Sequence, residues 1–298
     1  MRHLKHTSGL TLIELVIVMV VMGLIALVIL VFMQRTFVGY AQSRDRLLLA
    51  EQGGLALNRL RRETRLALPN SARLTTVGGA YYLEFAPVST AGRYRVGSAT
   101  GVDTAIACPV DSASIPDNGV LTLGLSDTCF KALGVVDTSG VFPGDWLVIF
   151  NAGAGYAGSD FYETGAATGG NKAALSSISS SATETRVAFA ANVFAWDSPG
   201  HRFYLAKNPV SYVCDPAAQT LTRWSGYPVQ SIQPTTGLSG LSGASSAALL
   251  KKVGSCKISY APSSISSQFG LVTINVSITA PSGDPLSLQV QSLVSNVP

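Results

Sequence analysis

The stretch Gly9-Leu10-Thr11-Leu12-Ile13-Glu14-Leu15 determines how the rest of this chain is organised. It opens an apolar run that continues to Met33, and the 19 residues from Leu15 to Met33 carry no charge. That length is close to the roughly 20 residues that a helix needs to cross a bilayer. We therefore expect a membrane-spanning segment over about residues 10–33.

Two simpler interpretations of this stretch fit less well. A secretory signal also begins with basic residues, here Arg2 and Lys5. Its apolar core, however, is only about 7–15 residues long, and a cleavage site with small residues follows it. Here the core is longer, and no such site follows Met33. A plain membrane anchor needs no carboxylate, whereas a charge at membrane depth is costly and points to a function for Glu14.

The same residues resemble the leader and anchor of type IV prepilins and secretion pseudopilins. This resemblance implies that residues 1–9 are a leader peptide, that a prepilin peptidase cuts between Gly9 and Leu10, and that the new amino terminus of Leu10 is methylated. The family usually has Phe where this chain has Leu10. The resemblance also implies that Glu14 serves pilus assembly by pairing with the terminal amine of a neighbouring subunit. Such pairing offsets part of the cost of placing either charge in lipid.

The charges are unevenly distributed along the 298 residues, of which only 13% are charged. Residues 1–68 contain nine Lys or Arg and four Asp or Glu, an excess of five, and residues 69–298 contain twelve and thirteen. A nearly neutral head lacks the basic surface of a nucleic-acid-binding protein. The basic leader favours an N-in orientation. We expect a single-pass protein of the inner membrane with residues 69–298 as a periplasmic head.

Four cysteines lie on the exported side, at Cys108, Cys129, Cys214 and Cys256. An even number there indicates two disulfides, and three connectivities are possible. The pairs nearest in sequence, Cys108–Cys129 and Cys214–Cys256, are favoured. Four unpaired, buried thiols are the alternative.

Residues 10–68 read as one long helix, because they contain no proline and Pro69 blocks continuation. The first half is apolar all round. The second half has an apolar stripe at helical spacing that should pack on the head, formed by Leu57, Leu60, Thr64 and Leu68, while Arg61, Arg62, Glu63 and Arg65 point elsewhere. Gly53-Gly54 is a weak point where the helix is expected to bend or melt locally. Many major pilins have a proline in the anchor half, so its absence makes this chain resemble pseudopilins and minor pilins there.

Beyond Pro69 the pattern changes to short alternating runs separated by Gly, Pro, Ser and Asp. The expected strands are Tyr81–Phe85, Val120–Leu125, Asp145–Phe150, Thr185–Phe189, His201–Leu205, Ser211–Cys214, Thr220–Trp224, Lys257–Tyr260, Leu271–Thr279 and Leu286–Leu293. The residues 215–218 between two of these runs read as a hairpin loop, and residues 151–182 and 233–248 as long surface loops. The expected fold class is α+β, with a long helix packed on a mainly antiparallel head.

Three head segments make the chain similar to minor pilin-like proteins of mannose-sensitive haemagglutinin (MSHA) type IV pilus systems. They are Leu68-Pro69-Asn70-Ser71, the pair Val210–Cys214 and Leu221–Trp224, and Gly270–Thr273 with the terminal Asn296-Val297-Pro298. The similarity does not extend to the two Gly- and Ser-rich loops.

Catalytic and metal-binding interpretations are weak. His201 is the only histidine that remains after removal of the leader, and no His/Cys cluster has metal-ligand spacing. We expect no cofactor and no metal centre, although loop aspartates at Asp103, Asp111, Asp117 and Asp127 leave a Ca²⁺ site open. Residues 153–158 match G-x-G-x-x-G, but no helix-forming sequence follows, so we read a loop. Asn275-Val276-Ser277 fits a glycosylation motif inside a strand, and we assign it no role.

The sequence therefore predicts a structural protein rather than an enzyme: a minor pilin of low copy number at the tip or in a priming complex. The expected partners are the prepilin peptidase, the inner-membrane assembly platform, and major and minor pilins that pack on the N-terminal helix. Three alternatives remain open: a minor pseudopilin of a type II secretion system, an anchored periplasmic hydrolase, and an adhesin. The adhesin would bind glycans through exposed tryptophans among Trp146, Trp196 and Trp224.

Overall fold

A computed structural model describes residues 11–96, 106–108, 119–164, 170–262, 268–281 and 283–298. The first element of the described residues is an α-helix, α1 (Leu12–Arg65), which is 54 residues long and corresponds to about 81 Å. It ends before the expected Leu68 because the next residues pair with an extended segment. The backbone N–H of Leu68 donates to the carbonyl of Ala86 at 2.8 Å, and Val88 N–H donates to Leu66 at 2.7 Å.

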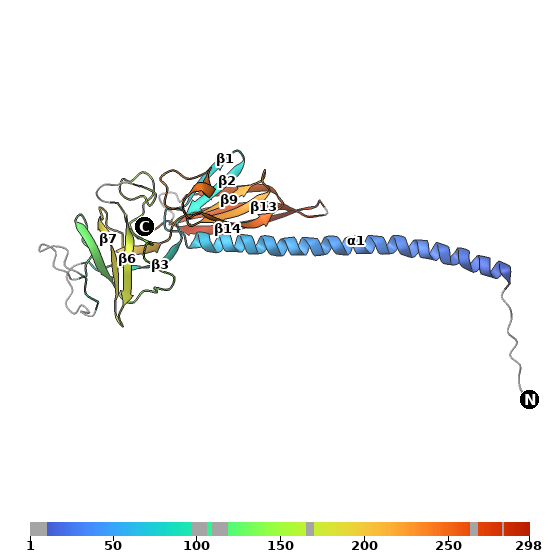
Figure 1. Cartoon of the computed structure of the whole chain (residues 1–298), viewed down its shortest axis with the longest axis horizontal. Coiled ribbons are helices and arrows are strands. Elements are labelled where there is room, and N and C mark those ends of the chain that lie inside the picture. Colours follow the sequence, from blue (N-terminus) through green and yellow to red (C-terminus); the bar gives the residue numbers. More distant parts are fainter. Residues whose placement is uncertain (1–10, 97–105, 109–118, 165–169, 263–267, 282) are drawn as a thin grey trace, which may run out of the picture.

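The two halves of α1 have different surroundings (Figure 1). The first half projects alone from the head, and the second half packs along β14 (Pro285–Ser295). The expected packing stripe is confirmed, because Leu57, Leu60 and Thr64 are all buried, as is Leu68 beyond the helix end.

The expectation of a bend or local melting at Gly53-Gly54 is wrong. The helix continues unbroken through both residues. A Cβ atom on Gly53 would lie 2.2 Å from Leu288 Cδ1 and 3.0 Å from Ile278 Cδ1, whereas one on Gly54 would meet nothing within 4 Å. Gly53 is therefore a point of close approach between α1 and the sheet.

The part of the head beside α1 contains two antiparallel sheets. The first has the order β1 (Arg73–Val77), β2 (Ala80–Phe85), β9 (Val210–Asp215), β10 (Thr220–Ser225) and β11 (Ser245–Lys251). The second has the order β12 (Val253–Ala261), β13 (Phe269–Thr279) and β14. Apolar side chains from both sheets share one core with Ala56, Leu57 and Leu60 of α1. We call this part the proximal body.

A six-stranded sheet forms a second body, inserted between β2 and β9. Its strand order is β3 (Val88–Arg93), β8 (Arg202–Ala206), β5 (Trp146–Ile149), β6 (Lys172–Ser180), β7 (Thr185–Val193) and β4 (Ser126–Ala132). An antiparallel bridge between Tyr94 and Ala132 joins the two edge strands, so that the sheet closes on itself. We call this body the barrel.

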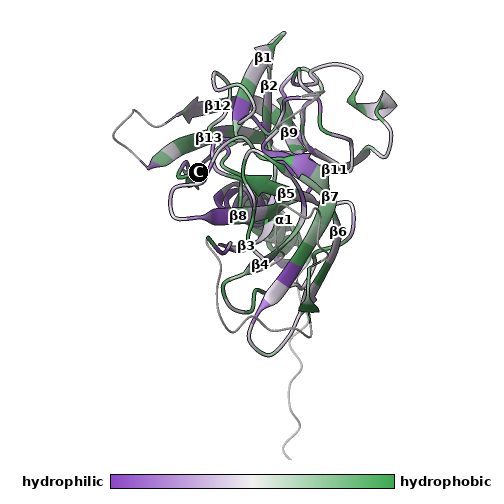
Figure 2. Cartoon of the chain, turned by 90° about the vertical axis from the view of Figure 1, so that its left-hand side faces the viewer, coloured by the Kyte–Doolittle hydropathy of each residue, from purple (hydrophilic) through white to green (hydrophobic). Residues whose placement is uncertain are grey.

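The interior of the barrel is aromatic. Phe130 packs against Tyr94, Phe189 and Phe203, with ring centroids 5.1–6.0 Å apart. Figure 1 places the barrel at the end of the molecule farthest from the free half of α1, and Figure 2 looks onto that end.

The α+β class is confirmed, and nine of the ten expected strand regions overlap observed strands. The strand expected at Val120–Leu125 is wrong, since that segment contains turns and only an isolated bridge at Val120. The two expected long loops are wrong in part. β6 lies within residues 151–182, and β11 begins at Ser245. The hairpin loop at residues 215–218 is confirmed, and the Asp215 carboxylate accepts N–H groups from Ala217 and Ala218.

Candidate functional site

The free half of α1 exposes a long, continuous apolar surface. Its large apolar side chains are exposed from Leu12, at 84%, to Phe37, at 63%. A soluble protein rarely leaves so large a continuous apolar surface in water. Among the described residues, α1 is the one helix that is long and apolar enough to cross a membrane. It thus fits a membrane anchor over the expected residues, up to Met33.

Glu14 lies in the first turn of α1, where a carboxylate interacts favourably with the helix dipole. Its side chain is exposed, and the next charged residue along the helix is Arg35. Gly9 and Leu10 lie outside the described residues. Leader cleavage, methylation and the pairing of Glu14 with a neighbouring amine therefore stay predictions.

Glu63 ties the end of α1 to the proximal body, contrary to the expectation that it points away from the head. Its carboxylate accepts hydrogen bonds from Arg223 Nε and from Tyr212 Oη, both at 2.8 Å, and from Arg59 Nε at 3.0 Å. Burial alone would raise the pKa of Glu63, but these hydrogen bonds outweigh burial and hold the pKa below its usual value.

A cluster of asparagines joins the segment after α1, the barrel and the C-terminal segment. The side-chain amide of Asn151 donates to the Pro69 carbonyl at 2.6 Å, and its Oδ1 accepts from Phe161 N–H at 2.8 Å. Asn70 Nδ2 donates to the carbonyls of Asn151, at 2.8 Å, and of Asn296, at 3.3 Å. Two segments that carried the MSHA resemblance, at residues 68–71 and 296–298, therefore meet here.

Arg73 forms a second link between the barrel and the proximal body. Its guanidinium carbon lies 3.6 Å from the ring centroid of Tyr162, whose hydroxyl donates to the Ser71 carbonyl at 2.9 Å. Arg73 Nε also bonds the fully buried Glu84 carboxylate at 2.5 Å. Burial raises the pKa of Glu84, although Arg73 and Tyr227 oppose that shift. Both bodies are thus held in one arrangement by buried polar contacts.

The four cysteines form two disulfides, Cys108–Cys129 and Cys214–Cys256, with Cα–Cα distances of 5.6 Å and 6.3 Å. This is the connectivity that nearness in sequence favours. The first reaches β4 of the barrel. The second joins β9 to β12 and so links the two sheets of the proximal body.

The residues considered for metal or catalytic chemistry do not come together in the part of the chain that the structure describes. Groups of three His, Cys, Asp or Glu suited to a metal are absent there. The Asp127 carboxylate is buried and accepts backbone N–H groups of Thr122, Thr128 and Cys129, while Asp103, Asp111 and Asp117 lie outside the described residues. His201 is half-exposed and lies 3.2 Å from Asp197.

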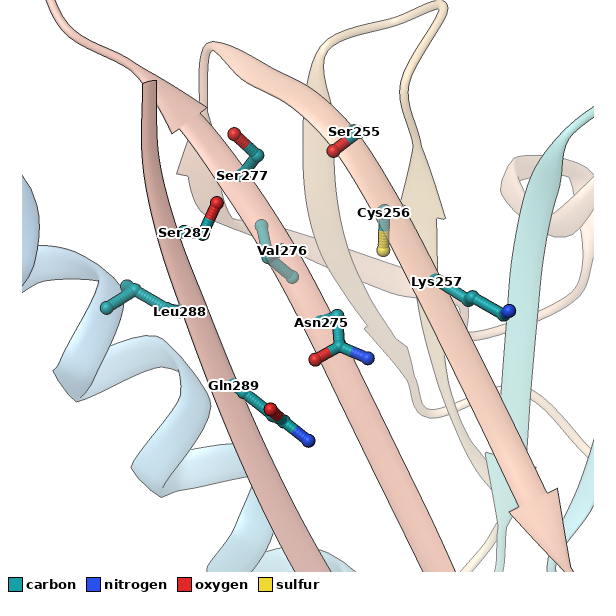
Figure 3. A pocket seen from close by; sticks show the side chains of 9 residues that line it. All are labelled: Ser255, Cys256, Lys257, Asn275, Val276, Ser277, Ser287, Leu288 and Gln289. Atoms are coloured by element: carbon teal, nitrogen blue, oxygen red, sulfur yellow. The ribbon is translucent and has the colours of Figure 1, made fainter. Parts of the chain in front are cut away.

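The remaining sequence motifs lie in turns and strands of the head. Residues 153–158 form turns with positive φ at Gly153, Gly155 and Gly158, and the described residues between them and β6 contain no helix. Asn275 and Ser277 lie on the outer face of β13, beside polar residues of β12 and β14 (Figure 3). Of the three tryptophans, Trp196 is the most accessible, at 48% exposed, and Trp146 and Trp224 are half-buried.

Comparison of the chain with protein-family models, with curated proteins and with solved structures finds no match.

Proposed function

We propose that this chain is a low-copy subunit of a type IV pilus or of a related secretion pseudopilus. It is held in the inner membrane by α1, with the head in the periplasm, until the prepilin peptidase and the assembly platform bring it to other pilins. Its role is structural rather than enzymatic.

One observation carries this proposal: the apolar first half of α1 projects from the head, and none of the other described residues cover it. An ordinary anchor needs only to be apolar. This helix also has a carboxylate near its start and continues as a rigid element into the head core. Both features support transfer from lipid into a bundle of similar helices.

The barrel supports a position at the end of a fibre. Every copy in a helical fibre must present both mating surfaces. The barrel lies beyond the proximal body, opposite the free helix, where a repeating subunit would meet the next layer (Figure 1). In a repeating subunit the barrel would clash with the next layer. A subunit at the end of the fibre, or in a priming complex, has no next layer above its barrel.

Substitution of Glu14 tests the proposal. Glu14→Ala removes the carboxylate and keeps a strong helix former. We expect normal membrane insertion and head folding with loss of incorporation into fibres, while Glu14→Asp retains partial function. Wild-type incorporation of Glu14→Ala, measured by complementation of a deletion strain, would contradict the assembly role.

The exposure of Trp196 favours a second candidate function, the binding of glycans as an adhesin. Its indole N–H donates to the Ala157 carbonyl at 3.0 Å, so the ring is fixed while about half of it faces solvent. Binding of the full chain to a glycan array, lost in Trp196→Ala but kept in Trp224→Ala, would support this function. The neighbouring genes distinguish the two versions of the main proposal. A gene among pilus genes would indicate a pilus subunit, and a gene among secretion genes would indicate a pseudopilus subunit.

A further inference from the structure

The strand β11 is an open edge of the five-stranded sheet of the proximal body. It pairs with β10 on one side, and no backbone hydrogen bond among the described residues joins residues 245–251 to another element on the other side. Its first four residues, 245–248, are exposed. An unpaired edge presents a row of free N–H and C=O groups, onto which another extended chain can add as a strand.

The exposed part of β11 lacks the features that usually protect a strand edge. Natural proteins block such edges with charged side chains, with proline, with bulges or with a covering segment. β11 contains no proline, and the chain carries no charge from Trp224 to Leu250. A register shift lies beside Leu249, whereas the pairing of Ser245 to Ala248 with β10 is regular. The first four residues of β11 therefore remain open to pairing.

α1 forms the second wall of a groove along the end of β11, which we call the edge groove. It has a volume of about 420 Å³ and is lined by Asp45, Leu48, Leu49, Gln52, Pro281 and residues 248–252. Leu48 is 45% exposed and Leu249 is half-buried, so the groove offers apolar surface that a further side chain would cover. From Asp45 to Gln52 the helix rises about 10.5 Å, which is the length of about three residues of an extended chain.

One end of the edge groove is basic. Lys251 and Lys252 are exposed there, and neither takes part in an ion pair among the described residues. Asp45 is the one acidic residue among the described residues that line the groove, so the groove has a net positive charge. Lys252 has a φ of 59°, in the left-handed region that non-glycine residues rarely adopt. Glycine would occupy this turn at lower cost, so a lysine there points to a use for its side chain.

The direction of β11 limits what can fill the edge groove. Its first residues pair with the part of β10 that contains Arg223, which bonds Glu63, and its last residues face Asp45, so β11 runs antiparallel to α1. A symmetric, antiparallel pair of two β11 strands would point two copies of α1 in opposite directions. Two anchors in one membrane exclude that pair, a step that rests on the anchor of the proposed function. Lipid tails do not reach the groove either, because Asp45 lies 12 residues, about 18 Å, beyond Met33.

We propose that the edge groove binds an extended, acidic peptide segment of another protein, which adds to β11 as a sixth strand of the sheet. Main-chain hydrogen bonds to the free edge supply affinity, and side-chain contacts supply selectivity. Small or apolar side chains of the segment contact Leu48 and Leu249. A carboxylate at one end of the segment lies against Lys251 and Lys252, where a basic segment would meet like charges.

Peptide selection on the full, detergent-solubilised chain tests this site. The probe is a random library of displayed heptapeptides, which match β11 in length. We expect enrichment of peptides that are rich in β-branched residues, lack proline and carry an acid at one end. The enriched peptide is then synthesised with N-methyl groups on its odd or on its even amides. Only one of these versions should lose binding, on the order of a hundredfold, because a strand bonds its neighbour through alternate N–H groups.

Variants of the chain locate the bound peptide. Lys251→Glu/Lys252→Asn should weaken binding of the acidic peptide on the order of tenfold, and asparagine suits the left-handed backbone at that position. Lys257→Glu changes an exposed lysine of β12 outside the groove and should leave binding unchanged. Leu48→Asp should also weaken binding, whereas Leu47→Asp, on an exposed residue that does not line the groove, should not.

Hydrogen exchange gives a readout that does not depend on substitutions. The bound peptide should slow amide exchange in β11 and leave β1, the opposite edge of the same sheet, unchanged. The absence of an enriched peptide, equal binding of both methylated versions, or protection of β1 instead of β11 would overturn the proposal. Dimers of the chain that Leu48→Asp abolishes would assign the groove to a second copy and overturn it as well. Peptide binding by a chain that never enters fibres would reject the proposed function alone, and incorporation into fibres without peptide binding would reject this site alone.

Discussion

Gly53 matters at the residue scale because of the side chains that lie over it. Figure 3 shows Leu288 on the side of β14 that faces α1, and an added methyl group would overlap it. We expect Gly53→Ala to destabilise the protein by about 1–3 kcal/mol through overpacking. Gly54→Ala is the matched control and should be neutral or stabilising by about 0.5–1 kcal/mol. Denaturant unfolding of the detergent-solubilised chain measures both, and equal effects of the two variants would contradict the close approach.

Glu63 gives the head a pH dependence of defined sign. Because the folded pKa of Glu63 lies below the unfolded value, the unfolded state binds more protons between the two. The stability from Glu63 is therefore present above the unfolded pKa, near 4.5, and is lost as the pH falls through the folded pKa. Glu63→Gln should cost about 2 kcal/mol at neutral pH and less at acid pH. An acid slope in Glu63→Gln that equals the slope of wild type would refute this assignment.

At the scale of elements, the two disulfides stabilise different bodies. In the chain-entropy model, sequence separations of 21 and 42 residues correspond to about 3 and about 4 kcal/mol. We expect Cys214→Ala/Cys256→Ala to expose the proximal body to protease first, and Cys108→Ala/Cys129→Ala to expose the barrel first. Limited proteolysis with mass mapping distinguishes them. Identical cleavage patterns would show that the two bodies do not unfold separately.

Much of this element-scale structure could be predicted from sequence. β13 was found because Val272, Ile274 and Val276 alternate with polar residues, and α1 because its apolar spacing and Pro69 are local signals. β6 was missed because its Ala and Ser side chains resemble a loop, although Ala173 and Leu175 enter the barrel core. Closure of the barrel depends on pairing between Tyr94 and Ala132, distant residues without a local signal.

In the candidate site, too, some residues could be predicted from the sequence and others could not. Glu14 stands out because one carboxylate interrupts an apolar stretch. Glu63 resembles any exposed charge of an amphipathic helix, because Arg223 and Tyr212 reach it from strands about 150 residues away.

At the scale of the molecule, the barrel is an insertion that the proximal body should survive without. The chain enters and leaves the barrel at adjacent points, since Lys207 N–H donates to the Pro87 carbonyl at 2.8 Å. We expect replacement of residues 88–206 by a short turn to preserve membrane insertion and the β2–β9 pairing. The contacts of Asn151 and Tyr162 with the segment after α1 would be lost, so the product should be less stable. Complete unfolding of the deletion protein, seen by circular dichroism, would contradict this modular organisation.

The proposed function requires assembly of this chain into a fibre through α1. Quantitative mass spectrometry of sheared, purified fibres from the native host tests that claim most directly. We predict a mature chain that begins at Leu10, carries an N-methyl group, and is present far below the abundance of the major subunit. Absence from the fibres, a retained leader, or a ratio near one to one with the major subunit would contradict the account.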